Sequence, residues 1–352
     1  MSTTGSDTIG VALLGFGFAG RIFHAPFITT TPGLSLRVVA TSQAGSVADA
    51  HPTARVAASP HEALQDDEVT LVVVATPNDT HAPLAEAAMR AGKHVVVDKP
   101  FTITLDEALG LAATAGTTGR LLSVFQNRRW DSDFLGLRAA IQAGTIGDVV
   151  EYRSEVSRWR PEVRDRWRER PGPGAGLWYD LGPHLIDQAV ELFGVPDAVQ
   201  ATLRALRPGG HTDDWFHVRL DYPTRQVILA SSMLAGEPAP RFVVRGTNGS
   251  VVKQGGDLQE QRLLAGERPG IAGWGSDPDP LIVFREGAEA ARHSVPAGDY
   301  GAFYIAMRDA MQQGSTPPVS VTSALTVMAI LTAGMQSSST GRAVSIADVL
   351  PR

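Results

Sequence analysis

The sequence predicts two domains: a doubly wound α/β domain over residues 1–125, and an α+β domain over residues 126–352 with a mostly antiparallel sheet. In the first third of the chain, short apolar runs alternate with segments of helical length, which is typical of a parallel sheet with helical crossovers. A glycine-rich turn ends the first run. Beyond residue 125, apolar and polar residues alternate with a period of two, as in strands with one buried face.

The first domain begins with the apolar run Ile9–Leu14, which leads into a turn rich in glycine. A short, continuously apolar run that enters such a turn is expected to be a buried parallel strand. The repeated alternation of apolar run and helical segment predicts one parallel sheet with right-handed crossovers. Further strands are expected at residues 35–40, 69–75, 93–97 and 121–125, with a helix at 81–91.

The second domain contains longer segments of alternating character, separated by turn residues, which predict antiparallel strands. A Gly- and Pro-rich stretch at residues 255–280 has little periodicity and is expected to be an extended loop. Strands are expected at 215–222, 226–231 and 241–245, and helices at 300–312 and 322–336.

Assembly is suggested by the apolar residues Phe216, Val218 and Leu220, which recur on one face of the strand at 215–222. An exposed apolar sheet face usually needs a partner surface. We therefore expect a homodimer, or a tetramer, that associates through the C-terminal sheet.

Composition excludes several kinds of partner and chemistry. The net charge of −6 does not favour nucleic-acid binding, which needs clustered Lys and Arg. Acidic residues interrupt the Arg-rich stretch at 153–170, so we expect a solvated, salt-bridged face there. The absence of cysteine excludes disulfides, a thiol nucleophile and a thiolate-bound metal.

The beginning of the chain, residues 1–7, lacks the basic start of a signal peptide. The apolar run that follows is too short to span a membrane. We expect a cytoplasmic protein without a membrane partner.

Gly15, Gly17 and Gly20 have the spacing of the dinucleotide-binding fingerprint, and Phe18 lies within the turn. The glycines serve a tight turn, a close approach of the backbone to pyrophosphate, and close packing of helix on strand. Since the pattern follows a strand and precedes a helical segment, we favour dinucleotide binding over an ordinary glycine turn.

The residues after the second strand bear on the choice of cofactor. NAD-specific folds place an acid there, which holds the ribose 2′-hydroxyl and would repel a 2′-phosphate. This sequence has Thr41 and Ser42 instead, and Arg21 begins the adjacent helix. The sequence therefore favours NADP over NAD, although Arg21 could equally be a surface residue.

Two more groups of polar residues follow strands, at the edge where open α/β sheets bind ligands. Thr76, Pro77, Asn78 and His81 follow one strand, and Asn78 or His81 could meet the cofactor. An Asx-type turn with Thr80 capping the next helix is the structural alternative.

Lys99 follows the next strand and is the cation nearest the expected position of a hydride acceptor. A solvated strand-end lysine is the alternative.

Asp180 and His184 are four residues apart and share a face if their segment is helical. Histidine can exchange a proton near neutral pH, and a carboxylate beside it can orient it and tune its charge. The alternatives are Asp180 as a helix N-cap and His184 as a core histidine. No third or fourth ligand stands at convincing spacing, so we expect no metal site.

Taken together, these motifs resemble the Gfo/Idh/MocA oxidoreductase family over essentially the whole chain. The resemblance implies a Rossmann domain followed by an open, largely antiparallel sheet domain that binds substrate. The segments 23–27, 95–101, 125–134 and 176–184 are similar to the branch containing NADP-dependent scyllo-inositol dehydrogenases. Two departures are Asp98, where the family usually has Glu, and residues 171–176, where a glycine run is common.

The resemblance implies that Lys99, Asp180 and His184 are the catalytic set and also touch substrate. His184 would accept the hydroxyl proton, Asp180 would orient its imidazole, and Lys99 would stabilise charge on the substrate oxygen. Asn127, Arg129 and Trp167 are further candidates to line the substrate pocket, unless the Arg and Trp merely cover the sheet.

The expected reaction is hydride transfer between NADP(H) or NAD(H) and a cyclitol or sugar. One alternative is a non-catalytic dinucleotide-binding sensor, which would more readily dispense with the Lys, Asp and His set. Another is a reductase acting on a different C=O, C=N or C=C substrate.

Overall fold

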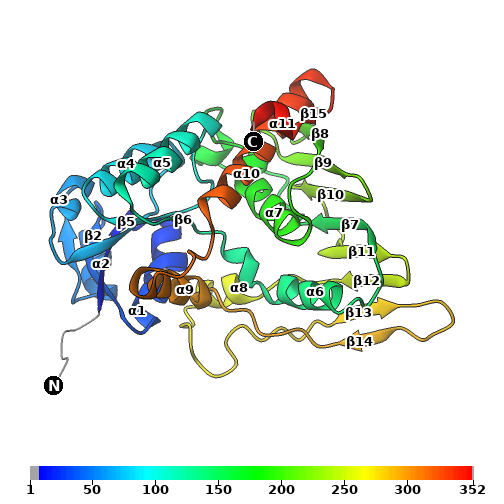
Figure 1. Cartoon of the computed structure of the whole chain (residues 1–352), viewed down its shortest axis with the longest axis horizontal. Helices are drawn as coiled ribbons and strands as arrows, with labels where there is room; N and C mark the ends of the chain where they lie inside the picture. Colours follow the sequence, from blue (N-terminus) through cyan, green and yellow to red (C-terminus); the bar gives the residue numbers. More distant parts are fainter. Residues whose placement is uncertain (1–7, 351–352) are drawn as a thin grey trace. The chain divides into compact units, whose positions relative to one another are not determined.

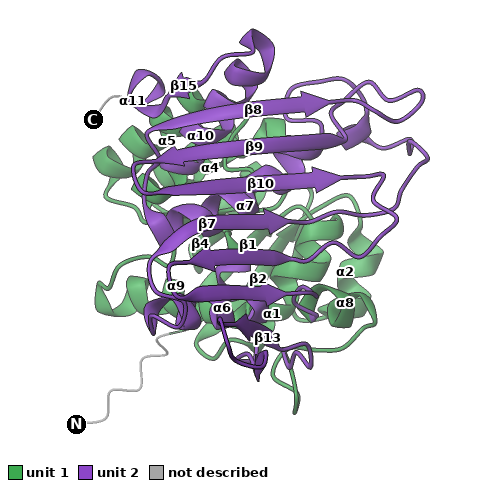
Figure 2. Cartoon of the chain, turned by 90° about the vertical axis from the view of Figure 1, so that its right-hand side faces the viewer, with its two compact units in different colours: residues 1–127, 259–274, 300–324 green, residues 128–258, 275–299, 325–352 purple. Residues whose placement is uncertain are grey.

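The computed structural model describes residues 8–350 and divides into two compact units (Figure 2). Unit 1 comprises the chain up to residue 127 together with 259–274 and 300–324, and unit 2 comprises the rest. The domain boundary predicted after residue 125 stays a prediction. The expectation about a signal peptide concerns residues 1–7, which lie outside the described residues.

Unit 1 is built on a parallel sheet of six described strands in the order β3-β2-β1-β4-β5-β6. All its strand pairs are parallel, which confirms the predicted Rossmann fold. The order reverses at β1 and β4, and ligands of such sheets bind outside the carboxyl ends of the strands at this point. The strands are β1 (Ile9–Leu14), β2 (Leu34–Ala40), β3 (Arg55–Ala57), β4 (Val69–Val74), β5 (His94–Val97) and β6 (Leu122–Val124).

Helices cover both faces of this sheet, which explains why its central strand, β1, is buried at every position. Figure 1 shows α4 and α5 on one side of the sheet and α1 and α9 on the other. The helical segments of unit 1 are η1 (Gly20–His24), α1 (Ala25–Thr30), α2 (Ala44–Ala50), α3 (Pro60–Leu64), η2 (Asn78–Thr80), α4 (His81–Arg90), α5 (Leu105–Thr118), α8 (Gln259–Leu264) and α9 (Gly301–Gln313).

Unit 2 is built on a sheet of nine described strands in the order β14-β13-β12-β11-β7-β10-β9-β8-β15. The pair β10 and β7 is parallel and the other pairs are antiparallel, which confirms the mostly antiparallel sheet. The strands are β7 (Val149–Glu155), β8 (Ala198–Arg204), β9 (Trp215–Tyr222), β10 (Arg225–Ser232), β11 (Phe242–Gly246), β12 (Gly249–Lys253), β13 (Leu281–Phe284), β14 (Ala291–His293) and β15 (Val344–Ser345).

The alternation in β9 divides its side chains between two faces of the sheet. Phe216, Val218 and Leu220 are fully buried within the unit, and the Phe216 ring lies 5.1 Å from that of Trp178. The expectation that these three residues serve a subunit interface is therefore wrong, because the core of the same unit covers them. Figure 2 shows the opposite face of the sheet with no helix in front of it.

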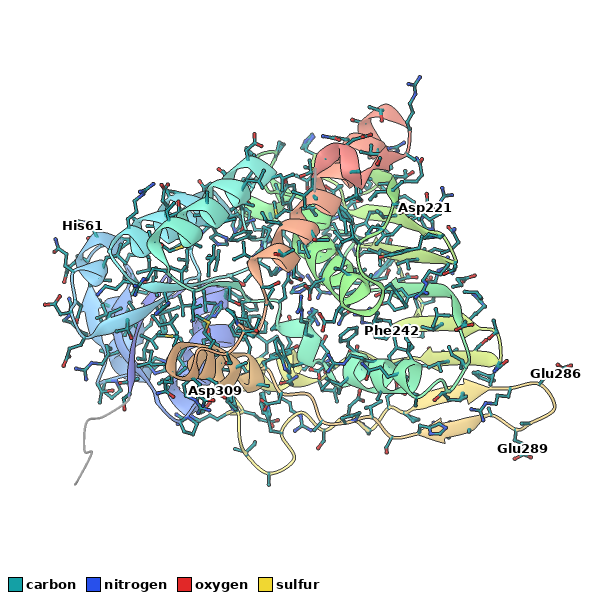
Figure 3. All side chains as sticks on the ribbon, in the orientation of Figure 1. His61, Asp221, Phe242, Glu286, Glu289 and Asp309 are labelled. Atoms are coloured by element: carbon teal, nitrogen blue, oxygen red, sulfur yellow. The ribbon has the colours of Figure 1, made fainter. Side chains whose placement is uncertain are left out.

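Other side chains of the sheet follow the same division. Phe242 of β11 is buried, whereas Glu286 and Glu289 lie at the tip of the hairpin between β13 and β14 (Figure 3). The helical segments of unit 2, with α10 lying mostly in it, are η3 (Asn127–Trp130), α6 (Ser132–Gln142), η4 (Trp167–Glu169), α7 (Leu177–Phe193), α10 (Val321–Thr340) and α11 (Ile346–Val349).

One prediction about local structure needs correction. The stretch 255–280, predicted to be an extended loop, contains helix α8, where Gln259 and Leu263 are buried. Two buried side chains one turn apart stabilise a helix too short for its periodicity to be visible in the sequence. None of the helices within residues 8–350 is long and apolar enough to cross a membrane.

Candidate active site

The glycine turn after β1 has the stereochemistry that a dinucleotide cradle needs. Gly15 has a φ of +97°, and a Cβ there would lie 2.5 Å from the Ala75 carbonyl oxygen. A Cβ on Gly20 would lie 2.1 Å from the Gly15 carbonyl oxygen. A Cβ on Gly17 would meet no described atom within 4 Å. Gly15 and Gly20 therefore serve the fold, while Gly17 leaves the backbone open to a pyrophosphate group.

Neutral side chains follow β2, and the neighbouring glycine turn carries exposed residues. Ser42 and Arg21 are exposed, as is Phe18 in the glycine turn. The Thr41 hydroxyl accepts a hydrogen bond of 3.1 Å from the Gln43 backbone N–H. These hydroxyls can hydrogen-bond a phosphate, and the sequence 41–43 carries no carboxylate that would repel one.

The residues after β4 form a compact polar turn. Asn78 and His81 are buried, Thr76 is half-buried and Pro77 is exposed. The Thr80 hydroxyl lies 2.6 Å from both the Thr76 hydroxyl and the Pro77 carbonyl oxygen. Thr80 stands at the N-cap position of α4, as the structural alternative predicts, but its hydroxyl makes no capping hydrogen bond to the helix.

His81 ties this turn to the residues after β5. Its Nδ1 lies 2.9 Å from the Pro100 carbonyl oxygen and its Nε2 lies 3.0 Å from the Thr76 carbonyl oxygen. One buried ring therefore connects the segment after β4 to the segment after β5.

Lys99 follows β5 and is half-buried, and its backbone N–H donates a 2.8 Å hydrogen bond to Oδ1 of Asp98. Burial alone would raise the pKa of the Asp98 carboxyl. The neighbouring His24, Lys99 and His81 outweigh burial and hold that pKa below its ordinary value. Asp98 is thus an ionised carboxylate beside the predicted catalytic lysine.

In unit 2, helix α7 carries both Asp180 and His184. The helix begins after Gly176, so the alternative in which Asp180 caps it is wrong. The cap comes from the loop before β9: the Asp213 carboxylate accepts a 2.6 Å hydrogen bond from the Trp178 N–H, and the Asp213 carbonyl accepts one of 2.8 Å from the Leu177 N–H.

Asp180 and His184 lie one turn apart on α7, which is the spacing that the sequence predicts. The side chain of His184 is buried, whereas that of Asp180 is 22 % exposed. An Asp180 carboxylate oxygen lies 3.6 Å from the Arg168 guanidinium. The pair thus offers one group near the surface and one shielded from water.

A small, partly open hollow of about 20 Å³ lies beside Asp180 within unit 2. Charged side chains of both signs line it: Arg166, Arg168, Arg207, Glu169, Asp180, Asp213 and Asp214. Several of these charges pair with one another, as Arg166 does with Glu169 at 2.6 Å. The wall can therefore donate to and accept from a hydroxylated ligand at many points.

Asp213 is the most strongly perturbed acid of this wall. Burial, reinforced by the charge of Asp214, raises its pKa to about 6, against the hydrogen bond from Trp178. It was missed in the sequence because nothing local marks a loop residue as the cap of a helix that begins 36 residues earlier.

The remaining predicted pocket residues occupy different settings. Asn127 is buried at the start of η3. Trp167 is 40 % exposed, and the Arg168 guanidinium lies 4.7 Å above its ring. Arg129 is buried and donates two hydrogen bonds to Asp187 of α7, at 2.7 and 2.8 Å. All three stay predictions as substrate contacts.

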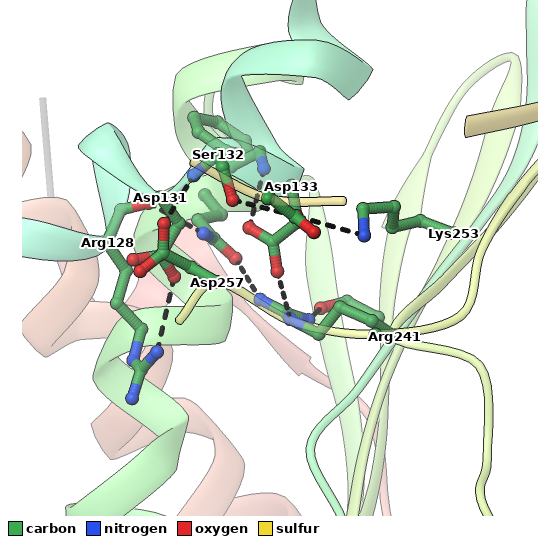
Figure 4. Close-up of polar contacts among 12 residues, drawn as sticks. Arg128, Asp131, Ser132, Asp133, Arg241, Lys253 and Asp257 are labelled. Carbon is green, nitrogen blue, oxygen red and sulfur yellow. Dashed lines mark hydrogen bonds and ion pairs between the residues drawn. The ribbon is translucent and has the colours of Figure 1, made fainter. Parts of the chain in front are cut away.

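A second buried arginine fastens α7 from the sheet side (Figure 4). Arg241 lies 3.2 Å from Asp133 and donates hydrogen bonds of 2.6 Å to Ser154 and to Gln188. Gln188 follows His184 by one turn, so this bond holds the helix face that carries His184. The same cluster contains Lys253, which lies 3.1 Å from Asp277.

Unit 1 thus brings together the fingerprint glycines, the residues after β2 and β4, and Lys99, while unit 2 brings together Asp180, His184 and the charged hollow. Within residues 8–350, no group of three or more His, Asp or Glu side chains is placed to hold a metal ion.

Two family models match the chain. A model described as the NAD-binding Rossmann fold of an oxidoreductase family matches residues 9–126, and one described as the C-terminal alpha/beta domain of the same family matches residues 138–346. Both carry the Gfo/Idh/MocA name.

Two curated relatives cover nearly the whole chain. The Escherichia coli protein YdgJ, described as an uncharacterized oxidoreductase, is 48% identical over 94% of this chain and 97% of its own. The Bacillus subtilis scyllo-inositol 2-dehydrogenase (NADP(+)) IolW is 36% identical over 97% of this chain and 96% of its own.

Solved structures of oxidoreductases also resemble this chain over nearly its whole length. A crystal structure of a Klebsiella pneumoniae protein superposes with a TM-score of 0.91, at 48% identity, over 96% of this chain and 95% of its own. The YPO2259 protein of Yersinia pestis superposes with a TM-score of 0.93, at 45% identity, over 98% of this chain and 99% of its own. The chain therefore belongs to the Gfo/Idh/MocA family of oxidoreductases, which use a nicotinamide dinucleotide.

Proposed function

We propose that this protein transfers a hydride between NADP(H) and a hydroxyl or ketone carbon of a cyclitol or sugar, as a scyllo-inositol dehydrogenase does. The observation that carries the proposal is the pair Asp180 and His184, one turn apart on a capped helix, with Asp180 adjoining a hollow lined with charged groups. The polar wall of this hollow suits a substrate with many hydroxyls.

The bound nicotinamide would supply the hydride acceptor or donor. As an alcohol is oxidised, His184 takes the hydroxyl proton, and Asp180 orients and stabilises the resulting imidazolium. Lys99 donates a hydrogen bond to the substrate oxygen and stabilises the negative charge that develops there. In ketone reduction the same groups act in reverse, with His184 returning the proton.

The cofactor would be held by the turn at Gly15, Gly17 and Gly20, with Thr76, Asn78 and His81 beside it. A Cβ on Gly17 would meet no described atom within 4 Å, which supports a close approach of the cofactor to the backbone there. NADP is preferred in this proposal because Thr41, Ser42 and Arg21 present hydroxyls and a cation where a carboxylate would repel the 2′-phosphate. The name of the relative IolW also specifies NADP(+).

A spectrophotometric screen tests the proposal. NADP or NAD is mixed with inositols or aldoses, and NADPH or NADH with their keto forms and with imines and enones, while absorbance at the reduced-nicotinamide band is followed. We expect turnover with a cyclitol or sugar and a higher kcat/KM with NADP. Tight cofactor binding without turnover of any compound would favour the sensor. Turnover confined to imines or enones would favour the other reductase class.

We also propose a homodimer, or a tetramer, that associates through the uncovered face of the unit 2 sheet. Cross-strand neighbours on that face include Ile228, Val243, Val252 and Ile282, with Arg153 between the first two. These apolar side chains are only half-buried in the single chain, so association would remove more of their surface from water.

A further inference from the structure

In unit 1, two buried side chains, Tyr304 and His24, lead to the half-buried carboxylate of Asp98, the residue before Lys99. His24 is fully buried, and its Nδ1 lies 2.6 Å from the Tyr304 hydroxyl oxygen. On the other side of the ring, its Nε2 lies 3.7 Å from Oδ1 of Asp98. The Phe125 ring packs against the imidazole with centroids 4.4 Å apart. The contacts therefore run from Tyr304 through His24 to Asp98, with the apolar Phe125 ring beside the imidazole.

The positions of the protons on Tyr304 and His24 follow from the chemistry of these groups and of Asp98. Burial, and then the negative charge of Asp98, raise the pKa of the Tyr304 hydroxyl well above its ordinary value, so the hydroxyl keeps its proton. It can therefore donate to Nδ1 of His24, which leaves the proton of a neutral imidazole on Nε2. That N–H faces the Asp98 carboxylate, which can only accept. One tautomer thus serves both neighbours.

The Asp98 carboxylate connects these contacts to Lys99. Its Oδ1 accepts the backbone N–H of Lys99 at 2.8 Å. The titratable groups that act on Asp98 are His24, Lys99, His81 and Tyr304. A buried carboxylate without such partners takes up a proton, because burial disfavours its charged form. Asp98 then loses the negative charge that attracts the ammonium group of Lys99.

We propose that His24 and Tyr304 are positioning residues that act through Asp98 to hold a negative charge beside Lys99 and so keep Lys99 correctly placed. The His24 ring supports the ionised carboxylate, and Tyr304 fixes the tautomer of that ring. The functional importance of this support rests on the proposed role of Lys99 in hydride transfer. The support itself is a property of unit 1 and can be measured without a substrate.

The composition of the chain makes Lys99 unusually easy to observe. The sequence contains three lysines, Lys93, Lys99 and Lys253. Lys93 is buried and its ammonium donates to the carbonyls of Asp66 and Val69, while Lys253 is fully buried. Reductive methylation with ¹³C-formaldehyde keeps the charge of a lysine and labels it for NMR. Lys99→Arg identifies its resonance.

The experiment follows the Lys99 methyl resonance against pH in the full chain and three variants. Tyr304→Phe removes only the hydroxyl that orients His24, and Asp98→Asn removes the charge while keeping the size. Tyr300→Phe is the matched control, because Tyr300 is also buried beside α9 and its ring packs on Phe27. Thermal melting of each variant reports whether it folds.

We expect the Lys99 resonance of Asp98→Asn to titrate about one pH unit lower than in the parent protein, the size typical of a lost neighbouring charge. Tyr304→Phe should move it in the same direction by a smaller, measurable amount, and Tyr300→Phe should leave it unchanged. An identical titration in the parent and Tyr304→Phe, with both folded, would overturn the proposal. Equal shifts in Tyr304→Phe and Tyr300→Phe would overturn it as well.

Turnover supplies a second readout. With a substrate found in the screen, Tyr304→Phe should lower kcat about tenfold, leave the KM for NADP unchanged and shift the pH profile of kcat in the direction of the Lys99 resonance. If the NMR shifts appear and no substrate turns over, the positioning role stands and the proposed function fails. If turnover occurs and the Lys99 resonance does not move in Tyr304→Phe, the proposed function stands and the positioning role of His24 and Tyr304 fails.

Discussion

The Asp213 carboxylate accepts a 2.6 Å hydrogen bond from the backbone N–H of Trp178 and so caps the helix that carries Asp180 and His184. The cap leaves no space for a side chain at Gly176, whose Cβ would lie 2.1 Å from Oδ1 of Asp213. The turn before α7 thus packs closely against the loop before β9. By capping the helix, this loop determines where α7, which carries the predicted acid and base, begins.

The first prediction concerns pH and stability. The pKa of Asp213 is raised from 3.8 to about 6 in the folded protein, so its charged form disfavours folding. Its contribution is most favourable below about pH 4 and is lost as the pH rises through 6, by up to about 3 kcal/mol. Asp213→Asn keeps an acceptor for the Trp178 N–H without the charge.

The free energy of unfolding of Asp213→Asn should therefore rise relative to the parent between pH 4 and pH 6.5, as measured by urea denaturation. Asp221→Asn, which changes a partly exposed acid of β9, is the control. A constant difference between Asp213→Asn and the parent across this range would contradict the prediction.

The glycine turn offers a comparison of two alanine substitutions. Gly15→Ala places a Cβ against the Ala75 carbonyl at a positive φ, so we expect a loss of about 1–3 kcal/mol of stability. Gly17→Ala meets no described atom and should melt at the temperature of the parent. Its affinity for NADPH, measured by fluorescence titration, should nevertheless fall at least tenfold. Unchanged affinity would remove Gly17 from the cofactor site.

Replacement of the catalytic candidates should separate chemistry from cofactor binding. Lys99→Met and His184→Asn should each lower kcat by about 10²- to 10⁴-fold, the usual contribution of a general acid or base. The Kd for NADPH should change less than threefold. His217→Asn, on the strand β9, is a matched histidine control. Near-normal turnover in both test variants would refute the proposed mechanism.

Cofactor preference can be tested at the end of β2. Ser42→Asp introduces a carboxylate where the proposal places the 2′-phosphate, so the KM for NADP should rise at least tenfold while that for NAD changes little. Ser46→Asp, at an exposed position within α2, should alter neither value. Equal effects of Ser42→Asp on the two cofactors would argue against a 2′-phosphate beside Ser42.

Assembly is tested by placing a charge on the uncovered sheet face. Val243→Lys should lower the molar mass in solution to that of the single chain, as measured by light scattering, because a buried unpaired charge is costly. Val195→Lys, at a residue that is 54% exposed just after α7, is the control. A multimer that persists in Val243→Lys would place the interface elsewhere.

Much of the fold is visible in the sequence because its signals are local. β1 and β9 have the predicted bounds, since continuous burial and strict alternation leave different patterns. The glycine turn and the polar residues after β4 and β5 also stand where the sequence places them. The strand β3, only three residues long, and the helix α8 were missed because such short elements show no period.

The sequence did not show whether the core of the unit or a partner subunit covers an apolar face of the sheet. The alternation of Phe216, Val218 and Leu220 predicts a buried face, but a core and a subunit interface require the same pattern. The structure places the three residues in the core of unit 2, against α7. The face left for association is the opposite face of the sheet, which carries the other set of alternating side chains.

By itself, the sequence determined the family, the two kinds of sheet and the identity of the residues at the strand ends, because local patterns encode these features. Only the tertiary structure decided that Asp213 caps α7 and that Tyr304 lies against His24, 280 residues earlier. Such contacts depend on how distant segments pack together, and a single sequence leaves no periodic or compositional trace of that packing.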